Sequence, residues 1–312
     1  MNFDALRRGL RELGYLEGEN LIIEYRSAAG DPGRFPELAS DLMRIGVDAV
    51  VTRGTPAVRA ARRASTTVPI IMASSGDPAY TGAVKSLARP EGNVTGLSSF
   101  SKELEFKRIE LLKEIAPATK RVGVLYNVEN PVLLPQWELL SASRSVHGLE
   151  AHLLDIRGPT DIERAFQSAS RERIDALTIG IDAITQANRR LIAQLAAQYR
   201  IPAIYASREF VEDGGLLSYS VSYPDLYLRA AHFVDRVLKG TRPAELPVEQ
   251  PTRFELILNV KAAKAIGLEF PPTLLARASA VFLDALLALS WRIDHWALCG
   301  VWLKVTNRPE RA

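Results

Sequence analysis

Small polar side chains gather where we expect the strands of two parallel sheets to end, and their types could bind a ligand. In α/β sheets, ligands collect at the carboxyl ends of strands, where the N–H groups of the following helices point outward. Hydroxyl and amide groups there would donate hydrogen bonds to a carboxylate, whereas Asp77 or Asp182 would accept them from an ammonium group. The candidate ligand-binding residues are Thr55, Ser75, Asp77, Thr95, Asn127, Asp182 and Ser207.

Several of these candidates also have an ordinary structural interpretation. Thr55 is a natural N-cap, and Asp77 precedes a proline, as turn residues often do. Thr185 could cap a helix just behind Asp182. The occurrence of such groups in both halves of the chain, at matching places, favours a shared binding cleft over a series of unrelated caps.

Residue patterns of known catalytic and cofactor sites fit the chain poorly. No Gly-x-Gly-x-x-Gly follows a strand, and the run from Gly96 lacks the second glycine of a nucleophile elbow. The four histidines include no pair at metal-ligand helical spacing, and Cys299 lies among apolar residues far from any candidate base. We therefore predict a protein that is not an enzyme, with no catalytic residue, no metal site and no cofactor.

Helical periods and short β-rich runs alternate along the chain, which predicts parallel sheets with helices on both faces. In the first series, we expect helices at 3–13, 35–45 and from 55, and strands at 21–25, 47–52 and 68–72. In the second, we expect helices at 102–115, 131–147, 161–171 and 185–199, and strands at 121–126, 150–155, 174–179 and 201–205. A strand at 215–219, a helix at 224–238 and a strand at 254–258 follow.

The two series resemble each other, which indicates two α/β lobes of similar topology. Asp48-Ala49 and Arg62-Arg63 match Asp175-Ala176 and Arg189-Arg190 at a constant offset. The second series opens with a strand before its first helix, whereas the first opens directly with its helix. By this symmetry one central strand of lobe one is missing, and its neighbours would be left with unpaired edges. This pattern predicts either a misassigned start or a fragment.

Composition and charge limit the class of protein. The chain has 312 residues, room for two domains of about 150 residues each, and 47% of them are hydrophobic. The net charge of +3 is too small to indicate a nucleic-acid surface, and a single cysteine excludes a disulfide scaffold. No segment reaches the roughly 20 uninterrupted apolar residues of a membrane-spanning helix. The first residues lack the pattern of an export signal, so the sequence as written predicts a cytoplasmic protein.

Several long motifs, in order, resemble the bacterial ABC transporter substrate-binding protein family. They are GLRELGYLEGEN at 9–20, GNVTGL at 92–97, KRIELLKEIAP at 107–117 and the run from LPVEQP at 246 to FELILN at 254–259. The resemblance extends from Phe3 to about Ala278. Within the family, the chain is similar to the branch that includes tryptophan- and tyrosine-type binding proteins.

The resemblance implies a type I periplasmic-binding-protein fold, with two doubly wound parallel-sheet lobes that close on a ligand by hinge motion. It implies lobe one at 1–102 plus about 216–242, lobe two at 103–215 plus about 248–278, and an atypical tail at 279–312. Within this fold, Thr55, Ser75, Asn127, Asp182 and Ser207 occupy the loops that line the cleft. The tail, which departs from the family, is interpreted as a frameshifted or read-through end or as an added amphipathic helix.

The function that the resemblance implies is delivery of a small organic solute, possibly an amino acid, to a membrane permease. The implied partners are an ABC permease and its ATPase, the implied location is periplasmic or membrane-anchored, and a monomer is the default. The alternatives are a cytoplasmic ligand sensor of the same fold, an enzyme using Asp77 and Asp182 as acid and base, and a non-functional truncated product.

Overall fold

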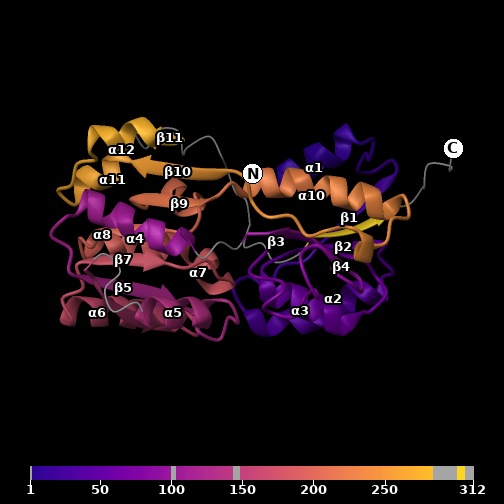
Figure 1. Ribbon diagram of the computed structural model, residues 1–312, viewed down its shortest axis with the longest axis horizontal. Helices are drawn as coiled ribbons and strands as arrows, with labels where there is room; N and C mark the ends of the chain where they lie inside the picture. The colour runs from indigo at the N-terminus through magenta and orange to yellow at the C-terminus, as the bar shows by residue number, and fades with distance from the viewer. Residues whose placement is uncertain (1, 100–102, 143–147, 284–300, 306–312) are drawn as a thin grey trace. The chain divides into compact units, whose positions relative to one another are not determined.

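The computed structural model describes residues 2–99, 103–142, 148–283 and 301–305 of the chain. It divides into two compact α/β units (Figure 1). Unit 1 comprises Met1–Phe100, Ser222–Arg253 and Ala297–Ala312, and unit 2 comprises Ser101–Val221 and Phe254–Trp296. Within the described ranges, no helix is long and apolar enough to cross a bilayer.

Unit 1 is built on a sheet whose five described strands lie in the order β1-β12-β2-β3-β4. The strands are β1 (Leu21–Tyr25), β2 (Ala49–Arg53), β3 (Ile70–Ser75), β4 (Val94–Ser98) and β12 (Val301–Val305). β2, β3 and β4 pair in parallel, whereas β12 is antiparallel to both of its neighbours. Every residue of β2, β3 and β4 is buried, as expected of strands covered on both faces.

Helices cover the two faces of the unit 1 sheet (Figure 1). The helices are α1 (Asn2–Glu12), α2 (Phe35–Arg44), α3 (Thr55–Ala64) and α10 (Tyr223–Leu238), with short 3-10 turns at Pro32–Arg34 and Pro243–Glu245. α10 packs on β2, β3 and β4, and α1 packs on α10, while α3 packs on β2 and β3 with α2 beside it. The α1 stripe of Phe3, Leu6 and Leu10 is fully buried, which explains why a period of three to four residues predicted this helix.

A buried tyrosine ties the end of α1 to α10. Tyr15 Oη donates a hydrogen bond to Asp235 Oδ1 at 3.0 Å. Burial, followed by the negative charge of Asp235, raises the pKa of Tyr15 to about 12. An unfolded tyrosine titrates near pH 10, so the folded state keeps this proton where the unfolded state loses it. The resulting stabilisation is complete below about pH 10 and is lost as the pH rises through about 12.

We expect the Tyr15→Phe variant to be less stable than the wild type by about 1 kcal/mol at pH 9, and this difference to shrink towards pH 12. Urea unfolding of both proteins across this range measures the difference. Tyr80→Phe, which alters an exposed ring, is the matched control and should show no such trend. A difference between Tyr15→Phe and wild type that stays constant with pH would contradict the proposed linkage.

Unit 2 is built on a sheet whose seven described strands lie in the order β11-β10-β9-β8-β7-β5-β6. The strands are β5 (Arg121–Tyr126), β6 (Glu150–Asp155), β7 (Ala176–Ile179), β8 (Ala203–Tyr205), β9 (Leu217–Val221), β10 (Phe254–Asn259) and β11 (Ala280–Phe282). β5 pairs in parallel with both β6 and β7, and only β10 and β9 pair antiparallel among these strands. β5 therefore lies in the interior of the sheet.

The side chains of β5 alternate between two apolar layers of unit 2. The helices of unit 2 are α4 (Glu103–Ile115), α5 (Leu133–Ala142), α6 (Pro159–Arg171), α7 (Ala183–Ala187), α8 (Arg189–Gln198), α9 (Glu209–Glu212), α11 (Val260–Ala265) and α12 (Pro272–Arg277). Val122, Val124 and Tyr126 of β5 pack into a core with α4 and α5, whereas Leu125 packs into a core with α6 and α8. The two layers confirm a parallel α/β sheet with helices on both faces.

Three local expectations from the sequence are corrected by the structure. The run that contains Thr95 is a buried strand, β4, because each of its five residues packs inside the sheet. The predicted helix at 185–199 is two helices that meet at Asn188. The chain returns to unit 1 at Ser222 and not at about 216, because Leu217–Val221 pairs with β8 and β10 of unit 2.

The expectation of unpaired strand edges in lobe one is wrong. β12 lies between β1 and β2 and pairs with both of them. Val305 of β12 is opposite Leu21 of β1, and Leu303 of β12 is opposite Ala49 of β2. The described part of the tail contains two strands, β11 and β12, and the tail residues 284–300 and 306–312 lie outside the described residues.

Candidate functional site

Asp182 is the centre of the polar groups at the strand ends of unit 2. It follows β7 and is the N-cap of α7, where its Oδ1 accepts a hydrogen bond from the N–H of Ile184 at 2.9 Å. In return, the N–H of Asp182 donates to Thr185 Oγ1 at 3.0 Å. Asp182, and not Thr185, is thus the cap, and only 6% of its surface is exposed.

Two asparagines hold the carboxylate of Asp182 from the loop that follows β5. Asn130 Nδ2 donates to Asp182 Oδ2 at 2.8 Å, and Asn127 Nδ2 donates to Asp182 Oδ1 at 3.3 Å. The Oδ1 atom of Asn127 accepts from the N–H of Glu129 at 3.0 Å, which fixes the amide so that its NH2 group faces Asp182. The strand ends of β5 and β7 therefore form one hydrogen-bonded group.

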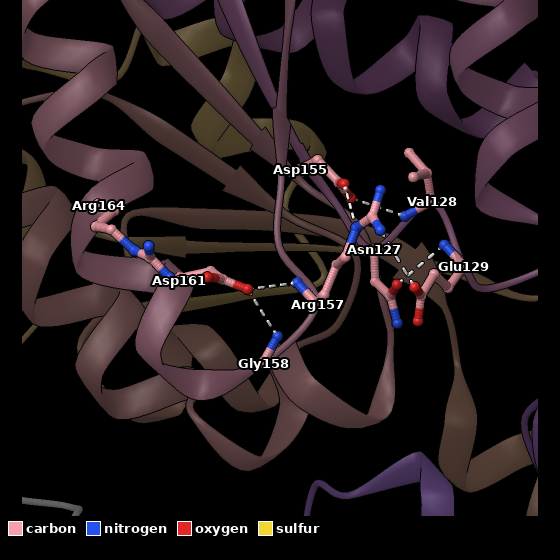
Figure 2. Close-up of polar contacts among 8 residues, drawn as sticks. All are labelled: Asn127, Val128, Glu129, Asp155, Arg157, Gly158, Asp161 and Arg164. Atoms are coloured by element: carbon pink, nitrogen blue, oxygen red, sulfur yellow. Dashed lines mark hydrogen bonds and ion pairs between the residues drawn. The ribbon is translucent and has the colours of Figure 1, made fainter.

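The loop that carries Asn127 is braced from the end of β6 (Figure 2). Asp155 Oδ1 accepts from the N–H of Val128 at 3.2 Å, and its Oδ2 accepts from Arg157 Nε at 2.9 Å. Asp161 Oδ2 then accepts from the N–H groups of Arg157 and Gly158, and the hydrogen bond from Arg157 is the main cause that lowers the pKa of Asp161. This bracing holds the polar loop in place without using the Asp182 carboxylate.

The negative charge of Asp182 is solvated by neutral donors. Its two oxygens accept three N–H bonds, which leaves about one of the four lone-pair positions of a carboxylate open. No lysine, arginine or histidine in the described residues forms an ion pair with it. A buried carboxylate in this state is suited to accept a hydrogen bond from a cationic ligand group.

Ser207 lies at the end of the next strand, β8, and is fully buried. Its Oγ donates to Gln186 Oε1 at 3.3 Å, so that the third predicted residue of unit 2 is joined to α7 beside Asp182. Asn130 and Gln186 were not predicted from the sequence. Asn130 is a second asparagine, three residues after Asn127 in the same turn, and this repetition could have indicated Asn130 as a site residue.

In unit 1, the structure brings Thr55 and Ser75 together at the ends of β2 and β3. Their hydroxyl oxygens lie 3.4 Å apart, and Thr55 Oγ1 accepts from the N–H of Gly76 at 3.2 Å. The N-cap of α3 is Gly54, with a φ of +84°, and not Thr55 as expected. Because Thr55 is the first residue of the helix, its hydroxyl is directed to the neighbouring strand end instead of capping the helix.

Asp77 and Thr95 have hydrogen-bond partners other than this pair of hydroxyls. The Asp77 carboxylate accepts from the N–H of Tyr80 at 3.0 Å, the ordinary role of an aspartate in a turn. Thr95 is fully buried within β4 and donates to the carbonyl of Leu246 at 2.6 Å. The structure thus brings together two of the four residues predicted in unit 1.

Arg53 is a charged residue at the strand ends of unit 1 that the sequence reasoning missed. It is the last residue of β2, is 7% exposed, and its guanidinium carbon lies 4.8 Å from the centre of the Tyr223 ring. Such stacking is a favourable cation–π contact. An arginine that ends an apolar strand, just before Gly54 and Thr55, is the signal that could have identified it.

No group of three or more His, Cys, Asp or Glu side chains in the described residues could hold a metal ion. The chemistry available in the described strand-end groups is hydrogen bonding and charge pairing with a small ligand. The two unit 2 sets, around Asp182 and Ser207, and the unit 1 set of Thr55, Ser75 and Arg53 each lie at the carboxyl ends of their strands, where ligands collect in such sheets.

Comparison with known proteins identifies the relatives of this chain. A solved structure from Vibrio cholerae, described as a conserved domain protein, shares 31% identity with a TM-score of 0.83 and covers 90% of this chain and 95% of its own. The ABC domain from Streptococcus pneumoniae in complex with L-Trp shares 27% identity with a TM-score of 0.81, over 90% of this chain and 95% of its own. A tyrosine-binding protein of Clostridioides difficile is 28% identical over 84% of this chain and 75% of its own length.

These similarities extend over both units, and the two solved structures confirm the two-lobed α/β fold. The sequence profile of the family described as ABC transporter substrate binding protein matches residues 2–282, most of the chain. The chain belongs to the ABC transporter substrate-binding protein family.

Proposed function

We propose that this protein binds a small zwitterionic solute, an aromatic amino acid, and presents it to the permease of an ABC import system. The observation that carries the proposal is the buried Asp182 carboxylate, which is held by Asn127, Asn130 and a backbone N–H and forms no ion pair in the described residues. The α-ammonium group of an amino acid supplies the missing positive charge and the remaining hydrogen bond.

The polar groups of unit 1 suit a ligand carboxylate group. Arg53 carries a guanidinium at the end of β2, and Thr55 and Ser75 carry hydroxyl groups at the ends of β2 and β3. Guanidinium and hydroxyl groups both donate hydrogen bonds to carboxylates. The unit 1 set thus suits the carboxylate group that an amino acid carries.

The names of two relatives support an aromatic side chain for the ligand. One is a tyrosine-binding protein, and another was solved with L-Trp. In the proposed role, the protein acts as a monomer outside the cytoplasmic membrane, and the ligand-bound state is the one that the permease and its ATPase receive. The family is one of solute-binding proteins, and we propose that the ligand leaves chemically unchanged.

Calorimetric titration and thermal unfolding with L-tryptophan and L-tyrosine test the proposal. A ligand present at a hundred times its Kd should stabilise the wild type by about 2.7 kcal/mol. Tryptamine lacks the carboxylate and indole-3-propionate lacks the ammonium group, so each should bind more weakly than tryptophan. The proposal would be overturned if neither L-tryptophan nor L-tyrosine bound, or if the ligand were recovered in a chemically altered form.

We expect Asp182→Asn to weaken amino-acid binding about tenfold or more, because hydrogen bonds to charged groups contribute about 1.5–3 kcal/mol. The asparagine side chain can still cap α7, so unfolding should stay cooperative. Asp175→Asn is the matched control and should bind as the wild type does, because Asp175 precedes β7 at the strand end opposite to Asp182 and likewise accepts backbone N–H bonds, from Lys120 and Arg121. Equal affinity of wild type and Asp182→Asn would remove Asp182 from the site.

A further inference from the structure

β12 fills a one-strand slot in the sheet of unit 1. Its five residues pair with all five residues of β1 on one side, and Val301–Leu303 pair with Ala49–Val51 of β2 on the other. β12 is the yellow arrow beside β1 and β2 in Figure 1. Neighbouring strands lie about 4.8 Å apart, so β1 and β2 are about 10 Å apart and cannot pair with each other. Any strand that joins β1 to the rest of the sheet must therefore lie in this slot.

In unit 2, the corresponding position is filled by a strand that is parallel to both of its neighbours. There β5 lies between β6 and β7 and is parallel to both. β1 and β2 also run in one direction, because each is antiparallel to β12. In both units, the two flanking strands therefore run in one direction. The units differ in the direction of the strand between them, which is antiparallel to its neighbours in unit 1 and parallel in unit 2.

A strand of either direction can satisfy the backbone groups that face this slot. Parallel and antiparallel ladders both pair the N–H and C=O groups of the flanking strands, and antiparallel pairing is slightly the more stable per residue. The inserted sequence, Val301-Trp302-Leu303-Lys304-Val305, consists of β-branched, aromatic and aliphatic residues with one lysine, a composition that favours strands.

We infer that the segment 301–305 is an internal strand donor, which closes a strand-acceptor slot between β1 and β2 and takes the position that β5 holds in unit 2. In this position it joins β1 to β2, the strand that leads into Arg53 and Thr55. The inference concerns the assembly of unit 1 and does not depend on which ligand the protein binds.

Disulfide trapping in the full chain tests the position and direction of the donor strand. With Cys299→Ser as background, Ile22→Cys with Lys304→Cys joins two residues directly opposed in the register, whose Cα atoms should lie about 4.5–5.5 Å apart. Ile22→Cys with Trp302→Cys is the matched control, because those residues would be opposed only if β12 were parallel. We expect the first pair to form an intramolecular disulfide at least ten times faster than the second.

Two outcomes of this trapping would overturn the inference. Faster closure of the control pair would show a parallel strand in the slot. Disulfide-linked dimers, in place of the intramolecular bond, would show that the donor strand comes from a second copy of the chain.

Hydrogen exchange provides a second measurement that does not require new cysteines. Leu303→Pro removes an N–H group from the middle of β12, and we expect the amides of β1 and β2 to exchange about tenfold or more faster. The amides of β7 in unit 2 are the internal control and should keep their protection even if unit 1 loosens. Unchanged exchange of β1 and β2 would show that β12 does not hold them together.

Discussion

Replacing Glu105 by alanine is expected to lower the free energy of unfolding of unit 2 by about 3–5 kcal/mol. Glu105 is 3% exposed and Arg108 is 7% exposed, and Arg108 Nη1 donates to Glu105 Oε2 at 2.6 Å. Arg108 Nε donates to the carbonyl of Tyr219 at 2.8 Å, and the hydroxyl of Thr178 donates to Glu105. Without Glu105, the guanidinium would remain buried with its charge uncompensated.

The negative charge of Glu105 also acts on a neighbouring tyrosine. Burial, followed by the charge of Glu105, raises the pKa of Tyr126 well above its ordinary value. Tyr126 is the last residue of β5 and directly precedes Asn127. The buried pair therefore lies beneath the strand end that carries one of the candidate ligand-binding residues, and its loss should weaken ligand binding as well as stability.

Urea unfolding of Glu105→Ala measures the expected loss. Lys107→Ala, which breaks an exposed ion pair with Glu110 on the same helix, is the matched control and should cost about 0–1 kcal/mol. The double variant Glu105→Leu with Arg108→Met removes both charges and should recover much of the stability. A loss below about 1 kcal/mol in Glu105→Ala would show that the buried pair is not needed.

Replacing Gly96 by alanine is expected to destabilise unit 1 by about 2–6 kcal/mol, the sum of backbone strain and overpacking. Gly96 lies in β4 with a φ of +120°, a conformation that residues with a Cβ rarely adopt. A Cβ at this position would lie within 3.0 Å of three backbone atoms of Met72 in β3. Because backbone atoms of a central strand cannot move aside, the clash would separate β3 from β4.

Thermal and urea unfolding of Gly96→Ala measure this effect. Gly92→Ala is the matched control, since Gly92 also has a positive φ, of +74°, but a Cβ there would meet nothing within 4 Å. The control should lose only about 1–2 kcal/mol, the cost of the left-handed conformation itself. Equal losses in the two variants would show that the close approach to Met72 contributes nothing.

Local patterns in the sequence were sufficient to predict most elements of the fold. β5 and β6 begin and end at the predicted residues, Arg121 to Tyr126 and Glu150 to Asp155, because each is a short run of β-forming residues between turns. The helices predicted at 3–13, 35–45 and 224–238 are found as α1, α2 and α10, because the spacing of their buried residues marks one apolar face. Motifs of several residues also predicted the family, which the profile match over residues 2–282 confirms.

The parts that the sequence did not predict depend on residues far apart in the chain. Thr95 was expected at a strand end because it lies in the short run Asn93-Val94-Thr95-Gly96, yet it is inside a strand, β4, that pairs with β3. Asn130 meets Asp182 across 52 residues, and Arg53 meets Tyr223 across a still longer separation. No local period encodes such contacts.

The sequence by itself determined the alternation of helices and strands, the two similar lobes and the family, since these depend on neighbouring residues and on motifs read in order. Only the tertiary structure decided which strand lies between β1 and β2. Backbone N–H and C=O groups at an open edge accept a strand from any part of the chain. A segment about 250 residues away, running in the opposite direction, therefore takes a place that symmetry had left empty.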